Sequence, residues 1–279
     1  MRKRILAVVA STLLSASTGT GAESDTATPR IPGGKPDLNG TWQAFNRANF
    51  DLEHHPARAA MALREGPHGP LAARAVVALG AVGAVPAGLG VVVGGEIPYR
   101  DDARKTREEN RANWLTLDPE IKCYLPGIPR ATYLPFPFRI TQNENALFFT
   151  YEYAGAVRDV HLKDPGPAPL NSWMGQSVGS WDGDSLVIET TGQNDRTWLD
   201  RAGNFHSEDL RVIERFTPTS PHTLLYEATL EDPQVFTRPW TIRMNLYRLV
   251  GDDAVLQQFN CVEFVEELIY GHLRKKPLD

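Results

Sequence analysis

Cysteine is scarce in this sequence, and metal or cofactor motifs are absent from it. Cys123 and Cys261 are the two cysteines of the 279 residues, and they do not form a Cys-x-x-Cys zinc motif. No His-x-His or His-Glu-x-x-His pattern occurs, and the glycine-containing run 175–179 falls in an expected strand rather than in a phosphate-binding loop. We therefore expect no metal and no cofactor. The two cysteines form either one disulfide or two buried thiols.

Positive charge is also in short supply. The formal net charge is −5, and removal of residues 1–22 would take it to −8 because Arg2, Lys3 and Arg4 would be lost. After that removal, the one remaining basic cluster is 274–276, near the end of the chain. A protein of this charge repels phosphate backbones, so nucleic acid is not an expected partner.

Charge-free runs long enough to cross a bilayer are nearly absent. Residues 75–93 carry no charge, but four glycines and one proline interrupt them. Because glycine and proline disfavour a continuous helix, we expect no stable membrane span there. The run would instead belong to a helical or irregular cap formed by residues 56–114.

The N-terminal residues resemble a targeting segment. A basic start, 1–4, precedes the apolar run 5–16 and a set of small residues that ends at Ala22. This order is typical of a secretory signal peptide that is cleaved near Ala22, with an uncleaved anchor as the alternative. We therefore expect a periplasmic or secreted protein, in which 23–37 form a flexible leader.

The remaining sequence has the pattern of a β protein. The full chain contains 23 glycines and 21 prolines, and turn sequences such as Asp182-Gly183-Asp184 separate short apolar runs. A further strand is expected around Trp42. The expected strands are 138–153, 157–162, 176–181, 185–191, 210–216, 223–230, 240–249 and 255–265.

Sequential antiparallel strands of this number protect their edges by closing into a barrel. Gly40-Thr41-Trp42 is similar to the Gly-x-Trp of the first lipocalin strand. The predicted fold is therefore mainly β, a lipocalin-like antiparallel barrel of about eight to ten strands, which is wide enough for one small ligand. One domain would cover 38–270, followed by the tail 271–279.

A turn centred on Gly155 would place Glu152 and Arg158 opposite each other on adjacent strands. Cross-strand neighbours share a face, so we expect both side chains inside the barrel. The pair would contact substrate, or it would be a structural ion pair.

The densest polar stretch is 192–208. His206 is the candidate general acid or base, because an imidazole titrates near neutral pH, and Asp195 or Asp200 would orient it. Trp198 would hold the stretch against the barrel rim and line the site. The alternative is a loop whose polar side chains only form turns.

Three further residues complete the candidate site. Arg130 and Tyr133 lie in a proline-rich strip. Arg130 would stabilise developing negative charge, or it would form a structural ion pair, and Tyr133 would contact substrate. Trp173 would line a pocket mouth or belong to the core.

Several runs together resemble a large group of exported, mostly uncharacterised bacterial proteins. The resemblance covers roughly 38–265 and implies export and a single compact domain, without an established activity to carry over. The runs that carry it are 94–99, 118–130, 181–184, 194–200 and 206–208.

Two classes of function follow. One is a cofactor-independent lyase, isomerase or hydrolase that acts by acid–base catalysis on a small hydrophobic or aromatic molecule inside the barrel. The other is a periplasmic lipocalin-like binding protein, in which the same polar groups only orient the ligand.

Overall fold

The structure is a computed structural model. It describes residues 28–59, 63–66, 69–72, 84–252 and 254–264. The expected signal peptide, the tail 271–279 and the first part of the apolar run 75–93, residues 75–83, lie outside these residues. Within them, no helix has the length and apolar character needed to cross a membrane.

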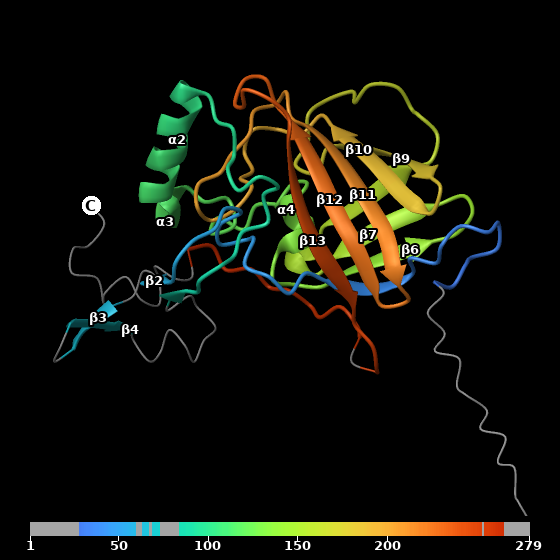
Figure 1. Ribbon diagram of the computed structural model, residues 1–279, viewed down its shortest axis with the longest axis horizontal. Helices are drawn as coiled ribbons and strands as arrows, with labels where there is room; N and C mark the ends of the chain where they lie inside the picture. Colours follow the sequence, from blue (N-terminus) through green and yellow to red (C-terminus); the bar gives the residue numbers. More distant parts are fainter. Residues whose placement is uncertain (1–27, 60–62, 67–68, 73–83, 253, 265–279) are drawn as a thin grey trace, which may run out of the picture.

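The described chain is built around a closed barrel of nine strands (Figure 1). Its neighbours pair in the order β1-β13-β12-β11-β10-β9-β8-β7-β6, and β1 closes the ring by pairing with both β13 and β6. All pairs are antiparallel except β8 with β9. The expected mainly-β barrel is confirmed. The strands are β1 (Gly40–Gln43), β6 (Phe138–Gln142), β7 (Leu147–Tyr151), β8 (Val157–His161), β9 (Gln176–Asp182), β10 (Ser185–Thr191), β11 (Arg211–Ser220), β12 (Thr223–Glu231) and β13 (Trp240–Arg248).

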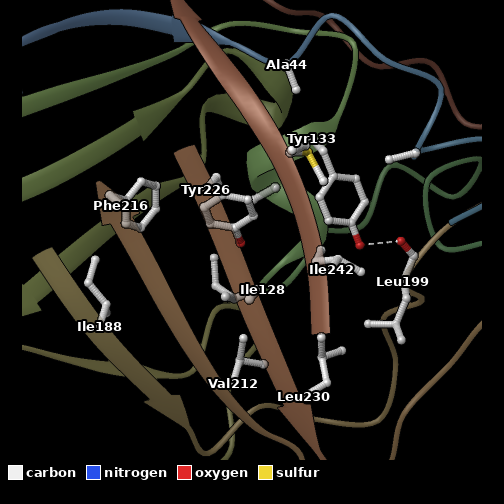
Figure 2. Close-up of a cluster of buried hydrophobic side chains, with 14 of the residues drawn as sticks. Ala44, Ile128, Tyr133, Ile188, Leu199, Val212, Phe216, Tyr226, Leu230 and Ile242 are labelled. Carbon is white, nitrogen blue, oxygen red and sulfur yellow. Dashed lines mark hydrogen bonds between the residues drawn. The ribbon is translucent and has the colours of Figure 1, made fainter. Parts of the chain in front are cut away.

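The inward-facing side chains, which alternate with outward-facing ones along each strand, fill the interior of the barrel. Along β12 every second residue is buried, as the period of two in a strand requires. Figure 2 shows the inward side chains of neighbouring strands, among them Phe216, Tyr226 and Ile242, in one packed layer. The rings of Phe216 and Tyr226 lie 5.0 Å apart, and the ring of Phe149 packs 5.5 Å from Phe216. Burial of each such ring stabilises the fold by about 2–3 kcal/mol.

Two strand predictions need correction. The run 138–153 forms two strands, because the Asn143 side chain accepts the N–H groups of Asn145 and Ala146 and turns the chain back. The run 255–265 forms no strand over its described part, 255–264. The reason is that β1 already pairs with both β6 and β13, so the ring has no free edge at that point.

Outside the barrel, the described elements are short. Helix α2 (Asp101–Ala112) is largely exposed, as its charged sequence predicts, and it stands to one side of the barrel (Figure 1). Residues 91–93 make backbone hydrogen bonds to β13. The other elements are α3 (Trp114–Leu117), α4 (Arg130–Tyr133), the 3-10 turn η1 (Tyr153–Gly155) and two small sheets that pair β2 (Arg58–Ala59) with β5 (Ala84–Val85) and β3 (Leu63–Gly66) with β4 (Gly69–Ala72).

The strand directions give the barrel two different ends. We call one the loop end, because long connections and α4 gather there: 118–137, 192–210 and 232–239. We call the other the turn end, where short turns meet the N-terminal segment: 30–39, 143–146, 182–185 and 220–223.

Candidate functional site

A polar cluster lies inside the barrel around Arg158 of β8. Its Nη2 pairs with Glu214 of β11 and donates to Thr190 Oγ1 at 2.7 Å, while its Nε donates to Ser177 Oγ at 2.7 Å. The Tyr226 hydroxyl donates to the other oxygen of Glu214 at 2.8 Å. The exposed fractions of the Arg158 and Glu214 side chains are 1% and 0%. The cluster is therefore a fully buried ion pair supported by hydroxyl groups.

The predicted partner of Arg158 was wrong. Arg158 faces the interior, as its strand position predicts, but it pairs in register with Phe149 and not with Glu152. The chain between β7 and β8 makes a 3-10 turn in which Ala154 has φ +55°, and this turn moves Glu152 out of the ladder. There Glu152 accepts the backbone N–H of Gln257 at 2.7 Å. Glu152 is thus no part of the interior cluster.

His206 lies at the loop end with both ring nitrogens engaged. Nδ1 lies 2.9 Å from the Ser207 carbonyl oxygen and must carry the proton, so Nε2 accepts the Thr197 hydroxyl at 2.6 Å. The exposed fractions of His206 and Thr197 are 2% and 1%. Burial lowers the pKa of His206 below its usual value. The imidazole is therefore a neutral, buried hydrogen-bonding group.

The expected orienting carboxylates do not reach this imidazole. Asp195 is exposed, and Asp200 binds the N–H groups of Leu52, Ala202 and Asn204 instead. Asp232, the carboxylate with the largest electrostatic effect on His206, is bonded to Ser207. Among the described residues, the partners of the His206 ring are therefore a hydroxyl and a backbone carbonyl, and neither Asp195 nor Asp200 orients it as expected.

Asp200 itself organises the loop. Burial, the largest cause, and the negative charge of Asp51, the second, raise the pKa of Asp200 to about 7. The hydrogen bonds from its N–H donors lower this pKa but do not offset the increase. The Asn204 side chain also donates to it, at 2.5 Å. Trp198 is buried and bridges to Phe205 within the same loop, as an anchor would.

Arg130 is held in a second buried charge cluster. Its guanidinium contacts Asp118 at 2.9 Å and Glu120 at 2.7 Å, and Arg201 makes two further bonds to Glu120. Burial raises the pKa of Glu120, but the positive charges of Arg201 and Arg130 have the larger combined effect and lower it to about 2. These contacts favour the structural ion pair for Arg130, since two carboxylates already occupy its guanidinium.

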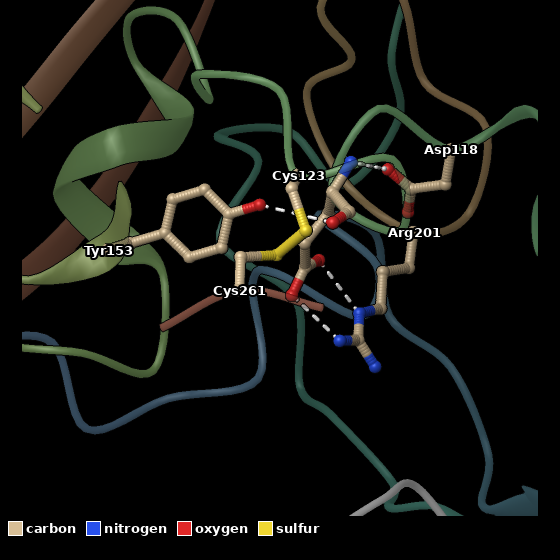
Figure 3. Close-up of a disulfide and its surroundings, with 6 residues drawn as sticks. Asp118, Cys123, Tyr153, Arg201 and Cys261 are labelled. Carbon is tan, nitrogen blue, oxygen red and sulfur yellow. Dashed lines mark hydrogen bonds and ion pairs between the residues drawn. A yellow bond between two sulfur atoms is a disulfide. The ribbon is translucent and has the colours of Figure 1, made fainter. Parts of the chain in front are cut away.

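A disulfide stands beside this cluster (Figure 3). Cys123 and Cys261 are bonded, with Cα atoms 5.7 Å apart, so the disulfide alternative is confirmed. Tyr153 donates to the Glu120 carbonyl at 3.1 Å on the same side. The bond therefore fixes the segment that follows β13 to the loop end.

Tyr133 and Trp173 occupy separate positions. The Tyr133 hydroxyl donates to the Leu199 carbonyl at 2.7 Å and so holds the His206 loop against α4 (Figure 2). Trp173 is half-buried, and its ring lies 4.8 Å from that of Tyr124. The structure thus gathers Arg130, Tyr133 and the His206 loop at one end, apart from Arg158.

A cavity of ligand size lies at the opposite, turn end. Its volume is about 530 Å³, and the N-terminal segment 31–35 covers it. Three of its lining residues, Leu147, Gly179 and Trp181, occupy inward-facing positions of their strands, and Leu162 directly follows β8. The cavity is therefore the mouth of the barrel.

Sequence reasoning missed this site. Trp181 was assigned to a strand, and its position in the alternation of that strand, on the inward face, was the feature that could have revealed the site. The cover could not be foreseen, because 31–35 belong to a polar segment that was expected to be flexible. Arg30 secures this segment through two bonds to Asp184, at 2.9 and 2.7 Å. Gly179 is required there, since a Cβ would lie 2.7 Å from a methyl group of Val160.

Comparison of the chain with protein-family models, curated proteins and solved structures finds no significant match. The function is therefore argued from the geometry of these sites.

Proposed function

We propose that this protein binds one small apolar or aromatic molecule at the turn end of its barrel, without catalysis. The mouth cavity carries the proposal. Ligand sites are typically clefts of roughly 300–1,000 Å³ with mainly apolar walls, and barrel mouths are common places for them. At about 530 Å³ the cavity lies within this range.

The lining of the cavity indicates the ligand class. Leu147, Leu162 and Trp181 offer aliphatic and indole walls to an apolar body. Lys35 lies over the Trp181 ring, with Nζ 5.6 Å from the centroid, and Glu144 also lines the cavity. A ligand with one polar end would therefore orient that end toward Lys35 and Glu144.

The packing below the mouth limits how deep a ligand can sit. Phe149 and Phe216 are fully buried and in contact with each other. A molecule at the mouth would rest on this aromatic layer. The ligand is thus expected to be small and to bind at the rim of the barrel.

Catalysis by His206 has less support. The Thr197–His206 hydrogen bond resembles a hydroxyl activated by a base, and this resemblance favours an enzyme. A general base must, however, reach the proton that it removes, and both side chains are buried at the loop end. We therefore place acid–base catalysis second to binding.

Export is part of the same proposal. The basic and apolar residues 1–22 have the order of a signal peptide. The Cys123–Cys261 disulfide supports it, because such bonds persist mainly in oxidising compartments. Cell fractionation with mass measurement of the intact protein tests this, and a cytoplasmic protein that retains residues 1–22 would contradict it.

Titration with N-phenyl-1-naphthylamine, a neutral aromatic probe whose fluorescence rises in apolar surroundings, tests the binding proposal. We expect saturable binding to the wild type and about tenfold or weaker binding to Trp181→Ala. Trp173→Ala is the matched control, because that half-buried tryptophan lies outside the cavity. Equal effects of the two substitutions, or no binding to the wild type, would overturn the proposal.

A further inference from the structure

The mouth cavity contains a cation that is not bound to a carboxylate. Lys35 lines the cavity, and its Nζ lies 5.6 Å from the centroid of the Trp181 ring, over its face. Such a ring attracts a cation but does not neutralise its charge. Within the part of the chain that the structure describes, the Lys35 ammonium makes no ion pair. It is therefore a half-buried positive charge beside an apolar wall.

The carboxylate of Asp184 is already bound by another residue. Arg30 donates to both of its oxygens, at 2.9 and 2.7 Å. The hydrogen bond from Arg30 is the largest cause of the lowered pKa of Asp184, and the charge of Lys35 adds a smaller effect in the same direction. Lys35 thus acts on Asp184 without contacting it. Two cations share one carboxylate here, so Arg30, Lys35 and Asp184 together carry two positive charges and one negative, a net charge of +1.

Glu144 is the acidic residue among those that line the cavity. It belongs to the turn between β6 and β7, and its side chain is exposed and lies beside Gly33, where an added Cβ would be 3.3 Å from its Oε1. Water screens the charge of an exposed side chain more effectively than that of a half-buried one. An anionic group of a ligand therefore gains more from Lys35 than it loses to Glu144.

The walls next to Lys35 are apolar. Leu147 begins β7 and is fully buried, Leu162 directly follows β8, and the Trp181 ring lies between the ammonium and the barrel interior. Polar groups in ligand sites usually fix orientation while apolar walls hold the body of the ligand. The cavity combines such walls with a positive charge at its rim.

From these contacts we infer that the ligand of the mouth cavity is a small organic acid with an apolar body, whose carboxylate pairs with the Lys35 ammonium. This inference rests on the binding function proposed above and adds the charge of the polar end of the ligand. Ion pairs that are also hydrogen bonds are the stronger polar contacts in proteins. Lys35 belongs to the segment 31–35 that covers the cavity, so the bound carboxylate would also hold this cover in place.

Competition against N-phenyl-1-naphthylamine tests the charge of the ligand with two compounds of nearly the same shape. 1-Naphthoate carries a carboxylate, and 1-naphthamide carries a neutral amide in its place. We expect naphthoate to displace the probe from the wild type at about tenfold lower concentration than naphthamide, as a hydrogen bond between charged groups would produce. The protein has a net charge of −5, so its overall field repels anions and cannot cause this preference.

Three variants assign the preference to Lys35. Lys35→Met keeps most of the side-chain length but removes the charge, and it should make naphthoate and naphthamide equal competitors. Lys105→Met is the matched control, because it makes the same change in net charge at an exposed position of α2 and should keep the preference for naphthoate. Lys35→Glu reverses the local charge and should bind the cation 1-naphthylmethylammonium more tightly than naphthoate.

The possible results separate this inference from the function on which it rests. If the neutral probe binds but naphthoate and naphthamide displace it equally from the wild type, the pairing with Lys35 is refuted and the binding function stands. The same conclusion follows if Lys35→Met retains the preference or if Lys105→Met loses it. A wild type that does not bind the neutral probe at all would overturn both.

Discussion

At the scale of single residues, buried ion pairs are the features whose loss should most affect stability. The Arg158–Glu214 pair crosses the interior from β8 to β11. Replacement of Arg158 by Ala would leave Glu214 buried without its cation, which costs about 3–5 kcal/mol. Urea denaturation should show this loss for Arg158→Ala.

Glu152→Ala is the control for that measurement. The Glu152 side chain bonds to the backbone of Gln257 and not to the interior cluster. Substitutions at the surface usually change the free energy of unfolding by about 0.5 kcal/mol or less. A loss below about 1 kcal/mol for Arg158→Ala would contradict the burial of the pair.

His206 should make stability depend on pH. Because burial lowers its pKa in the folded state, the unfolded chain binds a proton more readily below about pH 6.5. His206 should therefore contribute a loss of stability as the pH falls through that value, while Asp200, whose pKa is raised to about 7, contributes a gain in the same range. His206→Gln, which cannot titrate, should lose less between about pH 7.5 and about pH 5.5 in chemical denaturation. An equal loss in both proteins would show that His206 is not held neutral.

The sequence could predict the direction of these side chains better than their partners. Alternation along β8 predicts that Arg158 faces inward. Its partner Glu214 is 56 positions away, on a strand that is not a neighbour of β8, so local spacing could not reveal it. The neutral state of His206 depends on the carbonyl of Ser207 and on burial by the whole loop, which no motif encodes.

At the scale of elements, the alternating runs from β8 to β13 could be predicted because each is a strand with one buried face. The run 138–153 was misjudged because its apolar character continues on both sides of Asn143. The run 255–265 was misjudged because a long-range pairing, β1 with β6, decides whether the ring has room for another strand.

The disulfide is the element-scale feature with the largest expected effect on stability. It closes a loop with a sequence separation of 138. The double substitution of Cys123 and Cys261 by Ser should lower the free energy of unfolding by about 2–5 kcal/mol, because the unfolded chain gains conformational freedom. Denaturation of the oxidised wild type and of the variant checks this. Identical midpoints would show that the bond only tethers a segment that is already docked.

At the scale of the whole molecule, the ligand-sized cavity lies at the end of the barrel opposite to the loop in which the sequence places the candidate catalytic residues. The loop that carries His206 was expected to stand at the barrel rim and to line the site. Instead, α4 and the buried clusters of Arg130 and Asp200 fill that end. The open cavity lies at the turn end, under a segment that sequence composition describes only as polar.

Native mass spectrometry of the protein purified from its own cells tests the binding function most directly. The mouth cavity predicts a wild-type protein that carries one small organic molecule, a Trp173→Ala protein that retains it and a Trp181→Ala protein that has lost it. A wild type without any bound molecule, or a Trp181→Ala protein that retains it as well as the wild type does, would contradict ligand binding at the barrel mouth.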